Sequence, residues 1–345
     1  MNPEPPAPPI QHTCIPPAAL DTIAQNHVLG LHCIGTGADA GGHGADLPTQ
    51  RIPMPILGDG GALLYELWRA DRPCRGERCG DIVLRATDGM LFGVLEIDEA
   101  AGATAAGESA LCAAAERAYR QIFALLEAQG YGHLWRTWHY LPRIHAEECG
   151  LERYRQFNIG RHRAFEACGR RLDHSPAASA LGVDGGPFSI AFLAGRAPAT
   201  PVENPRQTSA FAYPRQYGPR SPTFSRAVTV ANGAAETLFI SGTASIVGYE
   251  TVHGGDVGAQ TRETVANLSA LLAQANARAP SPLYALENLV YRVYIRHADD
   301  YAEVRRVLDT SIGASICATY VQADICRRDL LLEIEAFAVA PRRVR

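Results

Sequence analysis

A group of side chains suited to binding an anion lies in residues 151–168, a segment with helical spacing. One face of this expected helix carries, at steps of three and four residues, Tyr154, Phe157, Asn158, Arg161 and Phe165. Arg161 therefore lies among aromatic rings, where a guanidinium group needs an anion, either a protein carboxylate or a ligand. Arg161 is a candidate for binding an acidic small molecule. A structural salt bridge or a surface arginine is the alternative.

A second cluster of arginine and tyrosine residues occupies residues 204–222. Its sequence, NPRQTSAFAYPRQYGPRSP, combines guanidinium and phenol groups with prolines that disfavour regular structure. Loops carry binding residues disproportionately often, so these groups are candidate ligand contacts. The alternative is a linker between domains, whose tyrosines and prolines pack against both sides.

A carboxylate stands on the mixed face of a third segment, residues 330–338. One face of this expected strand is apolar, and the other holds Leu331, Glu333, Glu335 and Phe337. Burial on such a face raises the pKa of a carboxyl group, and Glu333 would then serve as a general acid near neutral pH. The alternative is a glutamate on the solvent face of an antiparallel sheet. Cys326 ends the preceding expected strand, and the tight turn between the strands can bring its thiol opposite Glu333.

The basic residues of the chain are all arginine. The 345 residues include 32 Lys and Arg together, and the sequence contains no lysine. This excludes pyridoxal-phosphate Schiff bases, lysine-dependent aldolase chemistry and the phosphate-binding lysine of P-loops. Arginine forms bidentate contacts with carboxylates and phosphates, so acidic small-molecule substrates remain open. A GC-rich genome that encodes its basic residues as arginine is the alternative explanation.

Composition places the chain among ordinary globular proteins. Hydrophobic residues make up 47% and charged residues 20%, and the net charge of −4 argues against a nucleic-acid-binding protein. The sequence contains neither an apolar run of membrane-spanning length nor the pattern of a signal peptide, so we expect a cytoplasmic protein that does not bind membranes. The nine cysteines are an odd number, which predicts reduced thiols, and their spacing does not favour a zinc site.

The expected elements repeat one order in the two halves of the chain. Residues 81–194 predict strand, strand, helix, strand, helix, strand, with helices at 107–129 and 151–168. After the proline-rich connector 196–224, the same order follows with one more strand. We therefore predict a pseudo-duplicated α/β (α+β) fold with mixed sheets and helices packed on one face. The expected domains are 1–200, with a proline-rich N-terminus that is extended or loosely ordered, and 201–345, which begins with the connector.

Several segments carry a resemblance to known families. The segments LFISGTAS at 238–245, GAQT at 258–261 and LEIEA at 332–336 resemble the Rid (YjgF-type) fold over residues 218–340. Together with GLERYRQFN at 150–158 and YPRQYGPR at 213–220, they resemble the chorismatase family over the whole chain. Enzymes of that family remove the enolpyruvyl group of chorismate as pyruvate. The N-terminal half would then be a degenerate Rid-like copy.

The chorismatase resemblance implies roles for particular residues. Glu333 would protonate the enolpyruvyl methylene carbon, and Cys326 at the position that distinguishes family subtypes favours 3-hydroxybenzoate, with 4-hydroxybenzoate as a second product. Substrate would be held by a set that comprises Tyr154, Arg161, Tyr213 and Arg215, while Ala244 lies in a segment that varies among subtypes. The resemblance implies no cofactor and no metal. It leaves open a monomer or a homo-oligomer, with a trimer as one form.

Three other functions stay open at this point. A chorismate hydrolase would release a dihydroxy-cyclohexadiene carboxylate, and a non-catalytic Rid-like module would bind carboxylate metabolites or a partner protein. Imine deamination, the reaction of Rid enzymes, is disfavoured because their substrate-binding arginine would fall near Cys317 and Ala318.

Overall fold

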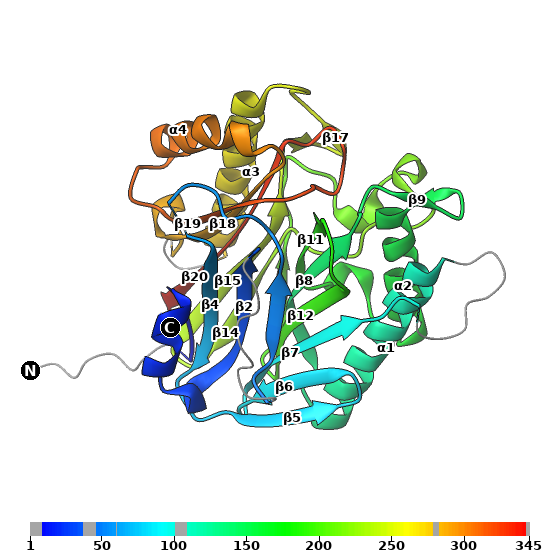
Figure 1. Cartoon of the computed structure of the whole chain (residues 1–345), viewed down its shortest axis with the longest axis vertical. Helices are drawn as coiled ribbons and strands as arrows, with labels where there is room; N and C mark the ends of the chain where they lie inside the picture. The colour runs from blue at the N-terminus through cyan, green and yellow to red at the C-terminus, as the bar shows by residue number, and fades with distance from the viewer. Residues whose placement is uncertain (1–8, 37–45, 60, 101–108, 279–282, 343–345) are drawn as a thin grey trace, which may run out of the picture.

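Three β-sheets turn their inner faces toward one another, and helices cover the outside of two of them (Figure 1). The computed structural model describes residues 9–36, 46–59, 61–100, 109–278 and 283–342. Two sheets have six strands each, one has four, and two short hairpins complete the strands. The hairpins consist of β9 (Glu147–Glu148) with β10 (Leu151–Glu152), and β16 (Ile246–Val247) with β17 (Glu250–Thr251).

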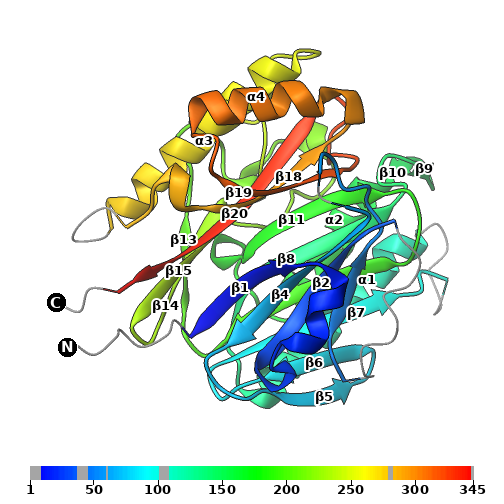
Figure 2. The same ribbon diagram turned by 60° about the vertical axis from the view of Figure 1, so that its left-hand side comes forward.

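The C-terminal sheet has the strand order β13-β14-β15-β20-β18-β19. Its strands are β13 (Ala199–Val202), β14 (Ala227–Asn232), β15 (Ala235–Thr243), β18 (Val290–Ile295), β19 (Cys317–Gln322) and β20 (Leu332–Pro341). Only β18 and β19 run parallel. Helices α3 (Val257–Asn276) and α4 (Tyr301–Ser311) cover one face and share a hydrophobic core with it (Figure 2).

The sheet of the N-terminal half repeats this arrangement strand by strand. Its order is β11-β8-β12-β7-β6-β5, and only β8 and β11 run parallel. The strands are β5 (Arg75–Cys79), β6 (Ile82–Ala86), β7 (Met90–Ile97), β8 (His133–Pro142), β11 (Ala177–Val183) and β12 (Phe188–Gly195). Helices α1 (Ala110–Gln129) and α2 (Arg153–Ala167) pack on one face. The expected pseudo-duplicated fold is confirmed.

The first sheet is a third version of the same four-strand core, and its described residues contain no α-helix. Its strands β1 (Ile10–Ile15), β2 (Val28–Gly35), β3 (Thr49–Ile52) and β4 (Leu63–Ala70) have the order β1-β4-β2-β3, with β2 and β3 parallel. The order β15-β20-β18-β19 has the same directions and the same chain sequence. Short 3-10 turns at Pro17–Thr22 and Gln25–His27 stand where the other copies have a helix.

Residues 10–15, within the N-terminus expected to be extended or loosely ordered, form the extended strand β1. These residues pair with β4 in continuous antiparallel register, and hydrogen bonding to a neighbouring strand outweighs the proline-rich context. The expectation for residues 1–8 lies outside the described residues, as do residues 107 and 108 of the expected first helix. Sequence analysis also missed the strands β3, β4, β5 and β11, and β13 forms a short strand within the connector. The division at residue 200 remains a prediction.

The inner faces of all three sheets meet in one hydrophobic core. Aromatic residues from each sheet contact there, including Trp68 from β4, Phe92 from β7, Trp138 from β8 and Phe239 from β15. The burial of large aromatic groups stabilises the sheets relative to one another. Edge contacts also join the two halves, because Ala177 bridges to Ser225 and Gly182 to Asp324.

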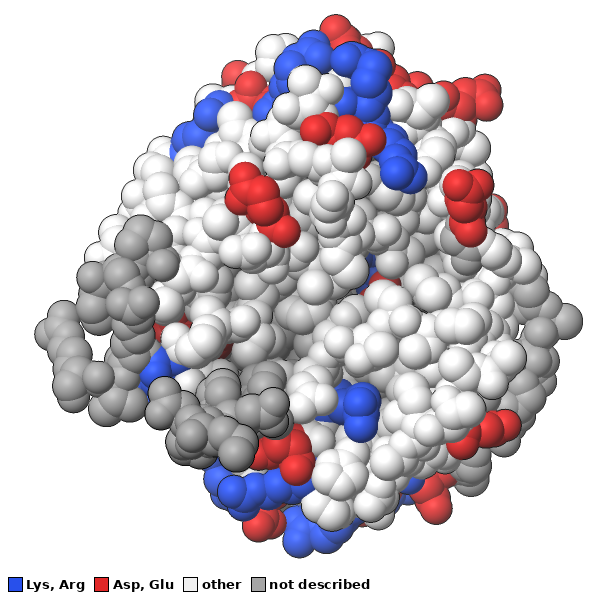
Figure 3. All heavy atoms as spheres, turned by 90° about the vertical axis from the view of Figure 1, so that its left-hand side faces the viewer, with Lys and Arg blue, Asp and Glu red and all other residues white. Residues whose placement is uncertain are grey.

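Charge is sparse on the face that Figure 3 presents. Charged side chains gather near α4 and along the lower edge, and the described surface between them carries no continuous basic stripe. Within the described residues, no helix has both the length and the apolar character needed to cross a membrane.

Close packing of α1 against α2 yields a stability prediction. A Cβ added at Gly160 would lie 2.1 Å from the Cys112 carbonyl oxygen of α1. We expect Gly160→Ala to lower the free energy of unfolding by about 1–3 kcal/mol, although alanine normally favours helix over glycine. Gly132→Ala, with nothing within 4 Å of the new methyl group, is the control for urea denaturation. Equal stability of the two variants would contradict this packing.

Candidate active site

A cavity of ≈ 500 Å³ opens between the two halves of the chain. Its walls come from α2 and β11 of the N-terminal half and from the connector, β15, β20 and the turn before β20 of the C-terminal half. Six of the seven residues predicted from the sequence line it: Tyr154, Arg161, Tyr213, Ala244, Cys326 and Glu333. Arg215 is exposed and is not among the lining residues. Segments far apart in the sequence thus meet at one place.

Glu333 is buried at the floor of this cavity. It lies on β20 opposite Tyr294 of β18, and its side chain is turned toward β15. There the strand carries an irregularity between Ile240 and Thr243, and Gly242 leaves the room that the carboxyl group occupies. A Cβ at Gly242 would lie 1.8 Å from Glu333 Oε1. The Ser-Gly-Thr-Ala-Ser segment therefore creates the space for this acid.

The surroundings of Glu333 favour its protonated form. Burial is the largest cause of a pKa raised to about 8, and the negative charge of Glu335 adds to it. Arg136, a hydrogen bond from Cys326 and Arg226 act in the opposite direction. Burial prevails, so at pH 7 the side chain is mainly a neutral acid, as the sequence argument for a general acid requires.

Cys326 lies beside the acid. Its Sγ is 3.8 Å from Glu333 Oε2, and the turn at residues 327–329 brings the two together as the sequence suggested. Burial, followed by the charge of Glu333, raises the pKa of the thiol. Cys326 is therefore a neutral thiol, which contributes shape and a weak S–H donor rather than a thiolate nucleophile.

Arg161 faces the cavity from α2 and is 1% exposed. Its guanidinium group stacks on Phe157 at 4.8 Å and donates from Nη2 to Asn158 Oδ1 at 3.2 Å. The buried Nε has no hydrogen-bond partner, and no ion pair joins Arg161 to a carboxylate within the described chain. The salt-bridge alternative thus lacks its carboxylate, which leaves this cation available for an anionic ligand.

Sequence reasoning missed two arginines of the cavity. Arg226 lies between the connector and β14, and Arg327 lies in the turn before β20. Arg226 is buried and donates from Nη2 to Tyr213 Oη at 2.8 Å and to the Thr208 carbonyl at 2.6 Å. Arg327 lies over the Tyr217 ring at 4.0 Å, and its Nη2 is buried without a hydrogen-bond partner. Both line the cavity. The sequence feature that could have identified Arg226 is its position directly before a buried strand. For Arg327 the sequence offers only its position next to Cys326.

The chemistry that this arrangement permits is specific. Arg161, Arg226 and Arg327 place several positive charges around the cavity, while its floor holds a protonated carboxyl group. Such a site can hold a small anion with more than one acidic group through charge-assisted hydrogen bonds. A neutral carboxyl group at Glu333 would be able to donate a proton to such a ligand.

Comparison with known proteins identifies related families. A family model described as "Chorismatase FkbO/Hyg5-like, N-terminal" matches residues 66–194, and one described as "Endoribonuclease L-PSP" matches residues 219–340. The second match covers the segment that resembled the Rid fold in sequence. The two matches together reach across both six-stranded sheets.

Curated relatives and a solved structure cover most of the chain. A chorismatase of Streptomyces rapamycinicus is 37% identical over 277 residues, which is 78% of this chain and 80% of the relative. A 3-hydroxybenzoate synthase of Streptomyces hygroscopicus is 38% identical over 64% of this chain and 68% of its own length. The crystal structure of a chorismatase matches with a TM-score of 0.85 and 31% identity, covering 95% of this chain and 98% of that structure.

The raised pKa of Glu333 predicts a pH-dependent cost in stability. The folded state binds this proton more tightly than the unfolded state, so its contribution to stability is complete below pH 4.5 and is lost as the pH rises through about 8. Glu333→Gln should therefore gain on the order of 3 kcal/mol relative to the wild type between pH 5 and pH 9. Urea denaturation at both pH values measures this, with exposed Glu127→Gln as the control. An unchanged difference would mean that Glu333 is ionised throughout.

Proposed function

Because this chain belongs to the chorismatase family, we propose that it cleaves the enolpyruvyl ether of chorismate to pyruvate and 3-hydroxybenzoate, with Glu333 as the general acid. The supporting observation is the protonated, buried carboxyl group on the floor of a cavity rich in arginine. Chorismate is a dicarboxylate with a ring hydroxyl and an enol ether, which matches the charge of the site. The proposed steps use only groups of the chain and the substrate.

Substrate binding is assigned to the residues that line the cavity. Arg161 is the first carboxylate partner, because its guanidinium group is buried and has no protein carboxylate. Tyr154 and Tyr213 contribute phenol groups, and Ala244 lies in the wall. The sequence suggested Arg215 for the second carboxylate, but this side chain lies outside the cavity lining. Arg226 and Arg327 take that role in our proposal.

The chemical step begins with a proton transfer to carbon. Glu333 gives its proton to the methylene carbon of the enol ether, and the positive charge that develops is an oxocarbenium ion. Proton transfer to carbon is intrinsically slow, so a neutral acid held in reach is the main contribution that the protein can make. The Glu333 carboxylate that remains then stabilises the cation electrostatically.

The fate of the oxocarbenium ion determines the product. Attack by the ring hydroxyl of the substrate, followed by loss of pyruvate and a ring proton, gives hydroxybenzoate and consumes no water. Attack by water gives pyruvate and a dihydroxy-cyclohexadiene carboxylate. Cys326 Sγ lies 3.8 Å from Glu333 Oε2, which in our proposal leaves little room for a water beside the acid, and one relative carries the name 3-hydroxybenzoate synthase. These observations favour the aromatic product, with 4-hydroxybenzoate as a minor one.

A non-catalytic binding module is the alternative from a different class. It would need the arginines but not a protonated acid, and nothing about binding explains why Gly242 makes room for Glu333. Imine deamination is disfavoured, because Cys317 and Ala318 of β19 stand where Rid enzymes would carry their arginine.

Replacement of the acid tests the reaction. We expect Glu333→Gln to lower pyruvate release from chorismate by about 10²–10⁴-fold, because the amide cannot donate a proton to carbon. The dissociation constant for chorismate, measured by calorimetry, should change by less than about tenfold. Glu127→Gln serves as the control. A variant with near-normal pyruvate release would refute Glu333 as the general acid.

Replacement of the thiol tests the product assignment. Cys326→Ala removes the sulfur atom beside Glu333 and makes room for water near the oxocarbenium carbon. We expect pyruvate release to continue and the ring product to shift from 3-hydroxybenzoate toward the non-aromatic diol. Chromatography of the products measures the ratio, with Cys79→Ala on the exposed strand β5 as the control. An unchanged product ratio would show that other residues exclude the water.

A further inference from the structure

A line of buried ion pairs runs from the first sheet to the side of the active-site acid. Glu66 of β4 pairs with Arg292 of β18, Arg292 Nη1 lies 3.1 Å from Glu335 Oε1, and Glu335 Oε2 lies 2.6 Å from Arg136 Nη2 of β8. All four side chains are at most 7% exposed. These ion pairs thus form a continuous chain of contacts that includes a residue from each of the three sheets.

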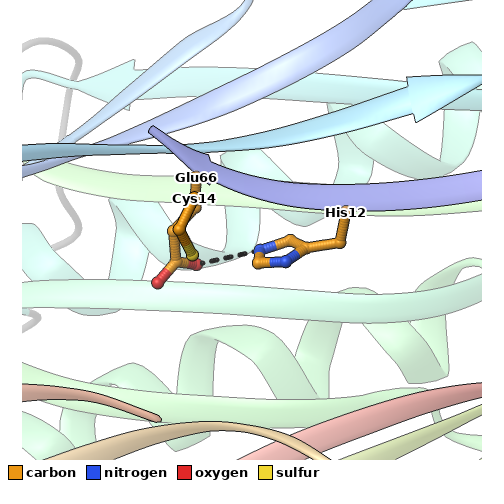
Figure 4. Close-up of side chains that lie close together, drawn as sticks. All are labelled: His12, Cys14 and Glu66. Atoms are coloured by element: carbon orange, nitrogen blue, oxygen red, sulfur yellow. Dashed lines mark ion pairs between the residues drawn. The ribbon is translucent and has the colours of Figure 1, made fainter. Parts of the chain in front are cut away.

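The outer end of this line is shown in Figure 4. His12 Nε2 lies 3.5 Å from Glu66 Oε2, and Cys14 reaches the same place from β1. Imidazole, thiol and carboxylate are all groups that bind metals. Both oxygens of Glu66, however, already accept hydrogen bonds from Arg292, and that guanidinium group opposes a second cation. The three residues therefore end the ion-pair line rather than form a ligand set.

The inner end of the line is next to Glu333. Glu335 is two residues away on the same face of β20. Its carboxylate accepts hydrogen bonds from Arg136, from Ser179 Oγ at 2.5 Å and from Trp138 Nε1 at 3.0 Å, in addition to the contact with Arg292. Ser179 itself lines the cavity. These contacts fix the position of the Glu335 side chain.

A buried ionic line of this kind is costly for the fold. Desolvation of buried charges often exceeds their mutual attraction, and well-packed hydrophobic residues would serve stability as well or better. A function therefore offers the better reason for these residues. Resting on the proposed role of Glu333, we propose that Glu335 is a positioning residue that holds Glu333 in its acid form, and that Arg136 and Arg292 hold Glu335 in place.

Charged and titratable groups face Glu333 from several elements, and their signs oppose one another. Glu335 on the same strand favours the acid form, whereas Arg136 from β8 and Arg226 from the segment before β14 favour the ionised form. The remaining neighbours are the neutral groups of Cys326 before β20, Tyr154 from α2 and Tyr294 from β18. Glu335 is thus the one negative group named here, and its charge counters two arginines.

Two substitutions with opposite expected effects test this proposal. The upper limb of the pH profile of kcat/KM reports the ionisation of the acid in the free enzyme. Glu335→Gln removes the negative charge, so we expect this limb to move by about one pH unit toward acid. Arg136→Gln removes a positive charge, so the limb should move toward alkaline pH. For Glu335→Gln, the ratio of rates at pH 8.5 and pH 6.0 should fall about 5- to 10-fold.

Glu66→Gln is the matched control. Glu66→Gln also removes a buried carboxylate that pairs with Arg292, but Glu66 is at the end of the ion-pair line away from Glu333. The upper limb of its kcat/KM profile should therefore move less than half as far as in Glu335→Gln. Circular dichroism on each variant checks folding. If Glu335→Gln does not fold, Glu335→Asp decides the question, because drawing the charge back by one methylene group should move the limb toward acid by a smaller amount. A merely structural role lowers activity equally at all pH values.

The outcomes separate this proposal from the proposed function. If the upper limbs of the kcat/KM profiles of Glu335→Gln and Arg136→Gln both stay in place, or both move in the same direction, the proposed role of Glu335 is wrong. If Glu333→Gln retains pyruvate release, the general acid itself is wrong, whatever the pH profiles show. If Glu333→Gln is inactive and the limbs move oppositely, both stand.

Discussion

The constraint on which this site depends is that one carboxyl group stays neutral among arginines. A substrate with two carboxylates requires cations, and each cation nearby stabilises the ionised form of Glu333. Burial favours the neutral form and outweighs the arginines. Glu333 lies inside the molecule on β20, and Gly242 has no side chain that would fill the space of the carboxyl group. Arg161 stays on the opposite helix, where it stacks on Phe157. Substrate carboxylates would then neutralise the cations at the moment when the acid must donate.

The threefold repetition of one sheet explains where the site lies. Three sheets with the same core order enclose a shared interior, and the cavity opens at the junction of two of them. Tyr294 on β18 and Tyr140 on β8 lie on corresponding strands of the two six-stranded sheets, and their hydroxyl groups hydrogen-bond at 2.9 Å. Opposite Tyr294 is Glu333, whereas opposite Tyr140 is Ser189, which accepts a hydrogen bond from Gln50. The repeat thus carries the acid in one copy and a structural hydroxyl in another.

Periodicity predicted those parts of the site that lie on regular elements. The spacing of Tyr154, Phe157 and Arg161 placed one face of α2 correctly, and alternation placed Glu333 on the face of β20 opposite its apolar residues, without showing that this face is buried. Arg226 and Arg327 lie at the ends of irregular segments, where no period reports the direction of a side chain. Arg215 lies on a short 3-10 turn, so the sequence could not show that its side chain lies outside the cavity lining while that of Arg226 belongs to it. In the first sheet, β1, β3 and β4 were missed because proline-containing segments separate the strands and only pairing with distant strands defines them.

The central claim is that Glu333 is a neutral acid at pH 7. Infrared difference spectroscopy between the wild type and Glu333→Gln measures this directly, through the carbonyl stretch of a protonated carboxyl group. Our account predicts a band that is present at pH 7, disappears with a midpoint near pH 8 and is missing from the variant. Loss of the band near the ordinary pKa of glutamate, about 4.3, would contradict the account, because the acid would then be ionised whenever the protein works.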